Sequence, residues 1–302
     1  MRLNRGLALG ATLLVLLSAC TSGGGSKPTI KVGSDGFYES KLMAEIYAQA
    51  LEAKGYTIDR TGIGLGARKV TAPALESGQI ELKPEYIGSG LAYYKGTPTG
   101  DPAKNKADLQ AVLTGKGGGI TVLDYTPAVD TNAFVVRKDT ADQYHLAKMS
   151  DLAAVQDQLK WGLATDCPTN PLCAGALKDA YGLQPKNVTP LAACDTPMAQ
   201  ALANRTIDVA ELCSTQPDIV VNGFVVLDDD KHTQPADNLA PLVRNDLLAK
   251  VGDQTAFEKI LNDVSARMDT ATLTQLGKEV TVDKKDVAAV AKEWLKANGF
   301  VS

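Results

Sequence analysis

Segments with the pattern of strands alternate with segments of helical pattern along the chain, and this alternation restricts the fold more than any other feature of the sequence. Residues 29–33 are predicted to form a buried strand, and residues 39–54 a helix that ends at Gly55. A second series of the same kind begins near Ser150, followed by a strand at 160–164. Strands that alternate with helices form α/β layers, and parallel sheets in such layers bind ligands beyond the carboxyl ends of their strands.

The remaining elements divide the chain into two lobes, the first interrupted by the second. We expect the chain to cross between the lobes near residues 126–131 and 227–237, where loop-forming residues follow predicted strands. The first lobe is therefore predicted to span 29–128 plus 229–302, and the second lobe 129–228. The other expected strands are 56–59, 80–85, 119–125, 133–137, 207–212 and 224–227, and the other expected helices include 68–76, 173–181 and 287–297.

The N-terminus has the features of a lipoprotein signal peptide. Two arginines precede an uncharged run over residues 6–17, which is shorter than the roughly 20 apolar residues that span a bilayer but suits a signal peptide of residues 1–19. The run ends in Leu17-Ser18-Ala19-Cys20, which resembles the lipobox, so Cys20 is expected to carry a lipid that anchors the protein to the membrane. Residues 20–28 then supply a flexible tether. An ordinary secretory signal with an incidental cysteine is the alternative.

The charge balance excludes one large class of partners. Removal of residues 1–19 takes away two arginines, which changes the formal net charge from -4 to -6. An acidic protein is not expected to bind nucleic acid, because that affinity depends on Lys and Arg contacts with phosphates. No second apolar stretch is long enough to cross a membrane, so the part after Cys20 is predicted to be a soluble domain outside the cytoplasm.

The cysteines agree with export. Four of them remain after Cys20, an even number that suits disulfides in an oxidising compartment. They allow three pairings, and the short two-proline loop favours Cys167–Cys173 together with Cys194–Cys213. A zinc site is the alternative, but there is no Cys-x-x-Cys, and neither His145 nor His232 lies at ligand spacing. We therefore expect no metal and no other cofactor.

An enzyme, for instance a surface hydrolase, is the rival class of protein. A Ser-His-Asp triad would have to use one of only two histidines, and no Gly-x-Ser-x-Gly precedes either of them. The glycine-rich segment 62–68 lacks the Gly-Lys-Ser/Thr end of a phosphate-binding loop, so a tight turn between strand and helix is favoured over a loop that binds an anion. We therefore expect that no reaction is catalysed.

Two tyrosines are candidates for ligand contacts. Tyr86 lies just past a predicted buried strand, and Tyr125 ends another strand immediately before the first lobe crossing. Strand ends at a crossing face the cleft of a two-lobed protein, where an aromatic ring attracts a cation. For Tyr86, core packing with a hydrogen-bonded hydroxyl is the alternative, and the sequence leaves both interpretations open.

Several motifs, in order and spacing, make the chain similar to a known family. They are Val32-Gly33-Ser34 before Glu39-Ser40-Lys41-Leu42-Met43-Ala44-Glu45-Ile46-Tyr47, Pro84-Glu85-Tyr86-Ile87-Gly88, Cys167-Pro168-Thr169 with Tyr181-Gly182-Leu183, and Asn222-Gly223-Phe224-Val225-Val226-Leu227 running to Pro235-Ala236-Asp237-Asn238. Over nearly the whole mature chain it resembles the substrate-binding proteins of glycine betaine, choline and carnitine ABC importers (the ProX/OpuC type). The resemblance implies a two-lobed venus-flytrap fold of the type II periplasmic binding protein class, with a mixed sheet flanked by helices in each lobe. It also implies an osmoprotectant-like solute bound between the lobes and delivered to ABC permease and ATPase subunits.

The chain departs from this family at four positions. Asp35 stands where the family often has lysine, and Asn170 where it has arginine, while Asn132 and Cys213 replace aromatic residues. A ligand carboxylate would therefore be buried without a charged partner. A choline-like cation, an amine, or a neutral polyhydroxylated or phenolic compound is expected in place of glycine betaine.

The strand ends and the resemblance together define the expected ligand site, in which Tyr86 matches a cage tyrosine and Ser89 a neighbouring hydroxyl. Its predicted residues are Asp35, Phe37, Tyr86, Ser89, Tyr125 and Asn132 from the first lobe and the crossing, and Asn170, Asp195, Thr196, Ser214 and Thr215 from the second lobe. We expect a monomer that captures a small solute, and a sensor or adhesin of the same fold is a further alternative.

Overall fold

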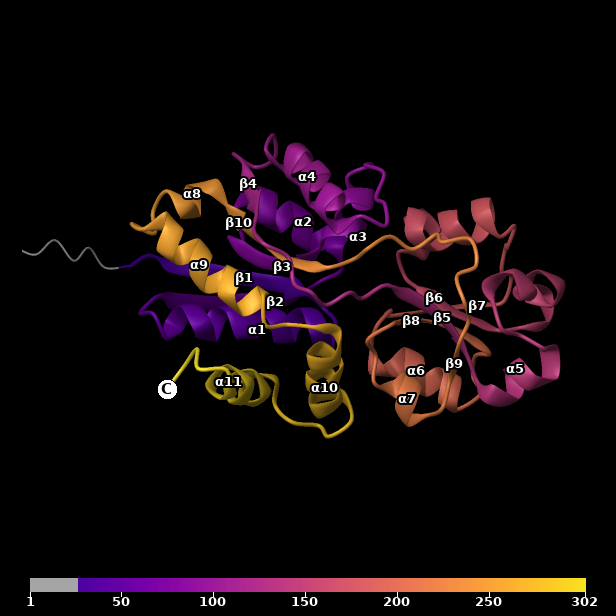
Figure 1. Cartoon of the computed structure of the whole chain (residues 1–302). Coiled ribbons are helices and arrows are strands. Elements are labelled where there is room, and N and C mark those ends of the chain that lie inside the picture. Colours follow the sequence, from indigo (N-terminus) through magenta and orange to yellow (C-terminus); the bar gives the residue numbers. More distant parts are fainter. Residues whose placement is uncertain (1–26) are drawn as a thin grey trace, which may run out of the picture.

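Two five-stranded mixed sheets organise the chain, one in each of two lobes that lie side by side (Figure 1). The computed structural model describes residues 27–302, so the expected signal peptide, the lipidated Cys20 and most of the tether lie outside the described residues. The strand order is β2-β1-β3-β10-β4 in the first sheet and β7-β6-β8-β5-β9 in the second. This confirms the predicted α/β fold with two lobes.

The first lobe combines the N-terminal and the C-terminal parts of the chain. Its strands are β1 (Thr29–Asp35), β2 (Thr57–Gly66), β3 (Leu82–Tyr86), β4 (Ile120–Val122) and β10 (Leu239–Arg244). Its helices are α1 (Tyr38–Glu52), α2 (Arg68–Ser77), α3 (Ile87–Tyr93), α4 (Pro102–Leu113), α8 (Asn245–Leu248), α9 (Gln254–Ser265), α10 (Thr270–Thr281) and α11 (Val287–Ala297). One hydrophobic core joins the sheet to α1, α9, α10 and α11, and a second core joins its other face to α2, α3 and α4.

The second lobe is built from the middle of the chain. Its strands are β5 (Asn132–Val136), β6 (Trp161–Ala164), β7 (Val188–Leu191), β8 (Val209–Cys213) and β9 (Val225–Val226), and its α-helices are α5 (Lys138–Tyr144), α6 (Thr196–Ala203) and α7 (Asp218–Val221). Short 3₁₀ helices cover Met149–Ala154, Gln156–Gln158 and Cys167–Thr169, and a π-helix covers Pro171–Ala180. The sheet again has a core on each face, one with the π-helix and α5 and one with α6 and α7.

The glycine-rich segment continues β2, although the sequence favoured a turn. A Cβ atom at Gly62 would lie 2.4 Å from Cγ2 of Ile80 and 3.0 Å from the carbonyl oxygen of Val32, so only glycine allows β2 to pack this closely against β1. Gly64 has a φ of 76°, in the left-handed region, and the β1–β2 register shifts along this stretch. The glycines therefore serve sheet packing and bring Gly66 beside Asp35.

Strand β10 is not among the strands that the sequence predicted. It runs antiparallel to both β3 and β4, with Pro241 opposite Pro84. Proline cannot donate a backbone hydrogen bond and argues against a central strand. The sequence pattern therefore did not indicate this strand, which joins the C-terminal part of the chain to the sheet of the first lobe.

Two chain segments cross between the lobes and contact each other. The first sheet takes its strands from residues 29–122 and 239–244, and the second from residues 132–226. In the crossings, Val129 forms a β-bridge with Asn238, and the Asp130 amide donates a 3.0 Å hydrogen bond to the carbonyl of Asp237. Paired crossings of this kind are suited to hinge motion of one lobe against the other.

None of the helices within residues 27–302 has both the length and the apolar character needed to cross a membrane.

Candidate functional site

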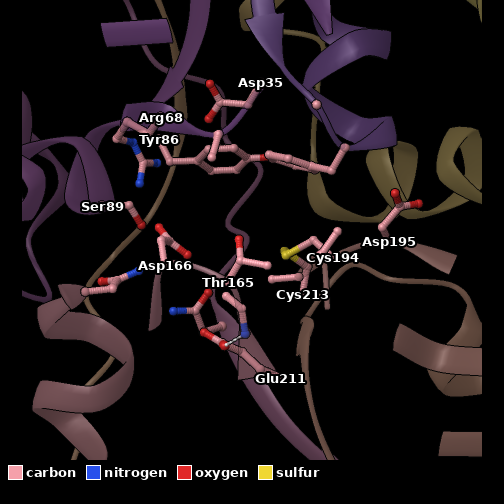
Figure 2. A pocket seen from close by; sticks show the side chains of 18 of the residues that line it. Asp35, Arg68, Tyr86, Ser89, Thr165, Asp166, Cys194, Asp195, Glu211 and Cys213 are labelled. Carbon is pink, nitrogen blue, oxygen red and sulfur yellow. Dashed lines mark hydrogen bonds between the residues drawn. A yellow bond between two sulfur atoms is a disulfide. The ribbon is translucent and has the colours of Figure 1, made fainter. Parts of the chain in front are cut away.

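A cavity of about 360 Å³ lies between the lobes, where parallel strands of both sheets end. Strands β1 and β3 are parallel in the first sheet, and β6, β7 and β8 are parallel in the second. Residues at or just past the carboxyl ends of these strands line the cavity, as Figure 2 shows for Asp35, Tyr86, Thr165 and Cys213. Its volume lies within the range of small-molecule sites, and its position is the one at which open α/β sheets bind ligands.

A chain of buried charges supports the first-lobe wall. Lys83, which is fully buried, contacts Oδ1 of Asp35 and Oε2 of Glu85 at 3.0 Å each, and Arg68 donates to Glu85 Oε1 at 2.9 and 3.0 Å. Burial alone would raise the pKa of Glu85, but Arg68 and Lys83 lower it to about 2. Burial opposes the charge of Lys83, yet Asp35 and Glu85 raise its pKa above the ordinary value.

Lys83 changes the expected role of Asp35. The sequence interpretation treated Asp35 as an uncompensated anion that would repel a ligand carboxylate. In the structure its Oδ1 accepts from Lys83 and, at 2.5 Å, from the hydroxyl of Thr71. Asp35 lines the cavity as predicted, but its charge is largely balanced by the lysine behind it.

The aromatic part of the wall consists of Phe37 and Tyr86. Their rings stack with centroids 5.9 Å apart and an interplanar angle of 29°. Tyr86 is only 6% exposed and also belongs to the first-lobe core, so both interpretations of this residue hold in part. Its hydroxyl donates to Glu39, and burial, followed by the nearby Glu39, raises the pKa of Tyr86 well above its ordinary value.

Two further carboxyl groups lie at the crossings. Asp237 accepts from the amides of Gly88 and Ser89 at 2.8 and 3.0 Å, and also from the Ser89 hydroxyl. Asp130 accepts from the Ser214 hydroxyl and the Thr215 amide at 3.0 Å each. Burial raises the pKa of each aspartate to about 6, against the effect of these hydrogen bonds.

The second-lobe wall contains a buried glutamate. Glu211 points from β8 toward the cavity, and its Oε2 accepts a 2.8 Å hydrogen bond from the amide of Ala164 (Figure 2). Burial, with a smaller contribution from Asp166, raises the pKa of Glu211 to about 7 despite that hydrogen bond. Asn132, Asn170 and Asp166 complete this wall with polar side chains.

Both predicted disulfides are present. Cys167–Cys173 has a Cα–Cα distance of 5.1 Å, and Cys194–Cys213 one of 4.8 Å. The second bridge lines the cavity and attaches the loop before α6 to the end of β8. The zinc alternative is therefore wrong for these cysteines, because sulfurs in disulfides are not thiolate ligands. Glu211 lies close to the sulfurs of the first bridge, but that group lacks metal-binding thiolates for the same reason.

The cavity has a strongly acidic lining. Among the residues that the structure describes, one basic side chain reaches it, that of Arg68. Six carboxyl groups line it, those of Asp35, Asp130, Asp166, Asp195, Glu211 and Asp237. A ligand with net negative charge would lose its hydration here and meet like charges, so the cavity favours neutral or positively charged molecules.

The structure brings seven of the eleven predicted ligand residues to the cavity. These are Asp35, Phe37, Tyr86, Ser89, Asn132, Asn170 and Asp195. The other four lie elsewhere. Tyr125 packs against the core with α2, α3 and α4, and Thr196 is the first residue of α6, behind its N-cap Asp195. Ser214 is exposed and donates to Asp130, while Thr215 is buried and donates to Glu39.

Sequence reasoning missed several lining residues, although some carried a signal. Arg68 was predicted to begin a helix after the glycine-rich segment and was considered as a partner for a ligand carboxylate, but it was not placed among the ligand residues. Asp166 lies two residues past the predicted strand 160–164. Glu211 is a charged residue inside the otherwise apolar strand β8, a pattern that indicates a buried polar contact. Asp130 and Asp237 lie in the predicted crossings, where the paired segments meet.

Comparisons with known proteins agree with this geometry. The family described as "Substrate binding domain of ABC-type glycine betaine transport system" matches residues 28–297. The "Glycine betaine-binding protein YehZ" of Escherichia coli K12 is 28% identical over 305 residues, covering 97% of this chain and 98% of the relative. The "Carnitine transport binding protein OpuCC" of Listeria monocytogenes is 26% identical over 308 residues, covering 97% of each. A solved structure of a glycine betaine/carnitine/choline ABC transporter matches with a TM-score of 0.68 and 25% identity, over 90% of this chain and 99% of that one.

Proposed function

The chain belongs to the family of substrate-binding domains of ABC-type glycine betaine transport systems, and from this premise we propose that its interlobe cavity captures a small solute of positive or zero net charge. This family is a class of transport proteins rather than of enzymes. The relatives named above carry glycine betaine and carnitine in their names, while the cavity of this chain has a lining rich in carboxyl groups. The specific solute is therefore proposed from the cavity itself.

The observation that carries the proposal is the acidic lining. Among the described residues, six carboxyl groups and one guanidinium line the same cavity of about 360 Å³. The guanidinium belongs to Arg68 and already donates two hydrogen bonds to Glu85. Three of these carboxyls, Asp130, Glu211 and Asp237, have pKa values raised to about 6 or 7, so they can accept a cation or hydrogen-bond a neutral hydroxyl. For a ligand carboxylate, the described lining residues offer one charged donor, the guanidinium of Arg68.

The proposed cycle is closure of the two lobes around the solute, followed by delivery to the membrane permease, with transport powered by the ATPase subunits. The proposed hinge lies at the crossings predicted near 126–131 and 227–237, since closure then requires few changes within either lobe; the bridge between Val129 and Asn238 supports this. The protein would act as a monomer, held at the membrane surface by a lipid on Cys20. No cofactor takes part in this cycle.

A thermal-shift screen of the ligand-free protein tests the proposal. The panel contains quaternary amines, primary amines, amino acids, polyols and phenolic compounds. A solute at 100 times its dissociation constant should stabilise the folded state by about 2.7 kcal/mol. We expect at least one cationic or neutral solute to raise the melting temperature.

Two threonine variants show whether that solute binds in the cavity. Thr165 lines the cavity and Thr169 is exposed in the same lobe but lies outside it. Thr165→Trp should abolish the shift by filling the site, while Thr169→Trp should preserve it. An equal loss in both variants, or stabilisation by anionic solutes alone, would contradict the proposal.

A further inference from the structure

Glu211 differs from the other carboxyl groups of the cavity in what surrounds it. It is 1% exposed, and only its Oε2 has a hydrogen-bond donor, the amide of Ala164 at 2.8 Å. That oxygen also lies 3.2 Å from Sγ of Cys173, which belongs to a disulfide and has no proton to donate. Within residues 27–302, no hydrogen bond reaches Oε1 and no basic side chain pairs with this carboxyl.

The second-lobe wall around Glu211 contains further carboxyl groups that are not paired with basic side chains of the described residues. Asp166 and Asp195 also line the cavity, and neither forms an ion pair with any side chain in the part of the chain that the structure describes. The first-lobe wall is different, because Lys83 and Arg68 compensate Asp35 and Glu85 there. Burying an unpaired carboxylate is costly unless a cation approaches it. We therefore expect the ligand to supply a positive charge next to the second-lobe wall.

The wall also lacks the groups that suit a quaternary ammonium. A quaternary nitrogen has no N–H to donate and is held by aromatic faces instead. The only aromatic side chains among the described lining residues are Phe37 and Tyr86, both from the first lobe. The second lobe offers oxygen acceptors in their place, on Glu211, Asp166 and Asn132. These groups require hydrogen-bond donors from the ligand.

We propose that Glu211 anchors the ligand of this cavity, and that the ligand is a small organic cation whose charge is carried by N–H groups, a primary ammonium or a guanidinium. This inference rests on the proposed function and makes its solute class more specific. The N–H groups donate to Oε1 of Glu211, and the rest of the ligand extends toward Ser89 and Arg68 in the first lobe. A charge-assisted hydrogen bond of this kind is stronger than the contact that a methylated nitrogen makes with the same carboxylate.

The carboxyl of Glu211 also gives binding a measurable proton linkage. In the empty cavity, burial and then Asp166 hold its pKa at about 7, although the Ala164 amide opposes them. A bound cation favours the ionised form, so binding at about pH 7 should release part of a proton from Glu211. Asp166 is the one other charged group that acts on Glu211 within the described residues, and it lies on the same wall.

The test is calorimetric titration of the ligand-free full domain with agmatine, putrescine, arginine and choline. Agmatine and arginine share one skeleton and differ by a carboxylate, while choline has a quaternary nitrogen. Glu211→Gln keeps an acceptor for the Ala164 amide but removes the charge. Asp179→Asn makes the same change of charge on an exposed residue of the π-helix, outside the cavity. Titration in buffers with different ionisation enthalpies measures the proton that is released.

We expect agmatine or putrescine to bind at least tenfold more tightly than arginine and choline, with release of part of a proton at about pH 7. Glu211→Gln should weaken this binding at least tenfold and abolish proton release, while Asp179→Asn should change neither. Choline binding as tight as that of agmatine, or binding of neutral polyols alone, would overturn the inference and leave the proposed function standing. Unchanged agmatine affinity in Glu211→Gln would also overturn it. Failure of these four probes and of the whole solute panel would overturn both proposals.

Discussion

The hydroxyl of Thr215 in the second lobe donates a 2.6 Å hydrogen bond to the carboxyl of Glu39 in the first lobe. Both residues are buried, and the other oxygen of Glu39 accepts from the hydroxyl of Tyr86. Burial and then Asp130 raise the pKa of Glu39 well above its ordinary value, which favours the uncharged carboxyl. The hydrogen bond between Thr215 and Glu39 therefore links the two lobes beside the cavity, in the arrangement that Figure 1 shows.

Loss of this hydrogen bond should favour separation of the lobes. Thr215→Val removes the hydroxyl at nearly constant volume, and a buried neutral hydrogen bond contributes about 1 kcal/mol. We expect solution scattering to show a larger mean radius of gyration for the ligand-free variant, and calorimetry to show ligand affinity reduced by about fivefold. Thr215→Ser keeps the donor and should behave like the original protein. Equal scattering curves for all three proteins would show that this contact does not hold the lobes.

Lys83 should be essential for stability, because its removal leaves Asp35 and Glu85 buried without their shared partner. Breaking a buried ion pair from one side costs about 3–5 kcal/mol. Lys83→Met should therefore lower the free energy of unfolding by that amount in urea denaturation. The control is Lys138→Met, since Lys138 pairs with Asp142 at 3.0 Å on the exposed surface, where the expected change is below about 0.5 kcal/mol. Similar losses of unfolding free energy in the two variants would show that the buried ion pairs of Lys83 contribute no more to stability than an exposed pair.

The sequence predicted best those site residues whose position depends on a single strand. Tyr86 was predicted at the cavity because the end of a strand is visible in the local pattern, and Asp35 because the family resemblance marks the position after the first strand. Lys83 was not recognised, since its partner Asp35 becomes its neighbour only when β1 and β3 pair. Nothing local in the sequence indicates which strands will be adjacent.

The same limit explains the errors at Thr215 and at strand β10. Thr215 was predicted to contact the ligand from the second lobe, but its hydroxyl donates to Glu39 of the first lobe. Strand β10 was missed because Pro241 argues against a central strand, although its carbonyl accepts from Leu123 at 3.0 Å. Contacts between lobes and between distant strands depend on the tertiary arrangement and therefore lie beyond pattern analysis.

Tyr86 should contribute to both stability and binding. Its ring stacks on Phe37 and is 6% exposed, so Tyr86→Ala should lower the free energy of unfolding by about 3–5 kcal/mol, as for other buried aromatic residues. Tyr86→Phe keeps the ring and loses only the hydrogen bond to Glu39, with an expected cost of about 1 kcal/mol. Urea denaturation measures both values. A melting temperature of Tyr86→Ala within a few degrees of the original would show that the ring belongs to the cleft alone.

Glu211 should make stability depend on pH in a defined direction. Its pKa is about 7 in the folded chain, compared with about 4.3 for an unfolded glutamate. Between these two pKa values, the folded state therefore holds a proton on Glu211 that the unfolded state has lost. The stabilisation of the folded state by this proton is complete below about pH 4 and is lost as the pH rises to about 7. Glu211→Gln stays neutral, so it should exceed the original protein in stability by on the order of 3 kcal/mol at about pH 8, and by almost nothing at about pH 4. Urea denaturation at the two pH values, with Asp179→Asn as control, measures the difference. Equal stability of the two proteins at the higher pH would contradict the raised pKa.

Glycine betaine should bind poorly, at best in the millimolar range. Its carboxylate would enter a cavity lined by six carboxyl groups. Arg68, the one cation among the described lining residues, already donates twice to Glu85. Asn170, in the position where the family has arginine, offers a neutral hydrogen bond that contributes only about 1 kcal/mol. Arg68 has one further terminal nitrogen that could donate to a ligand carboxylate. Arg68→Lys is therefore the informative variant, because a lysine cannot donate to Glu85 and to a ligand at the same time in the forked geometry of an arginine. Calorimetric titration of both proteins with glycine betaine decides the question. Micromolar binding that disappears in Arg68→Lys would show that this arginine forms the carboxylate clamp that the charge of the cavity argues against.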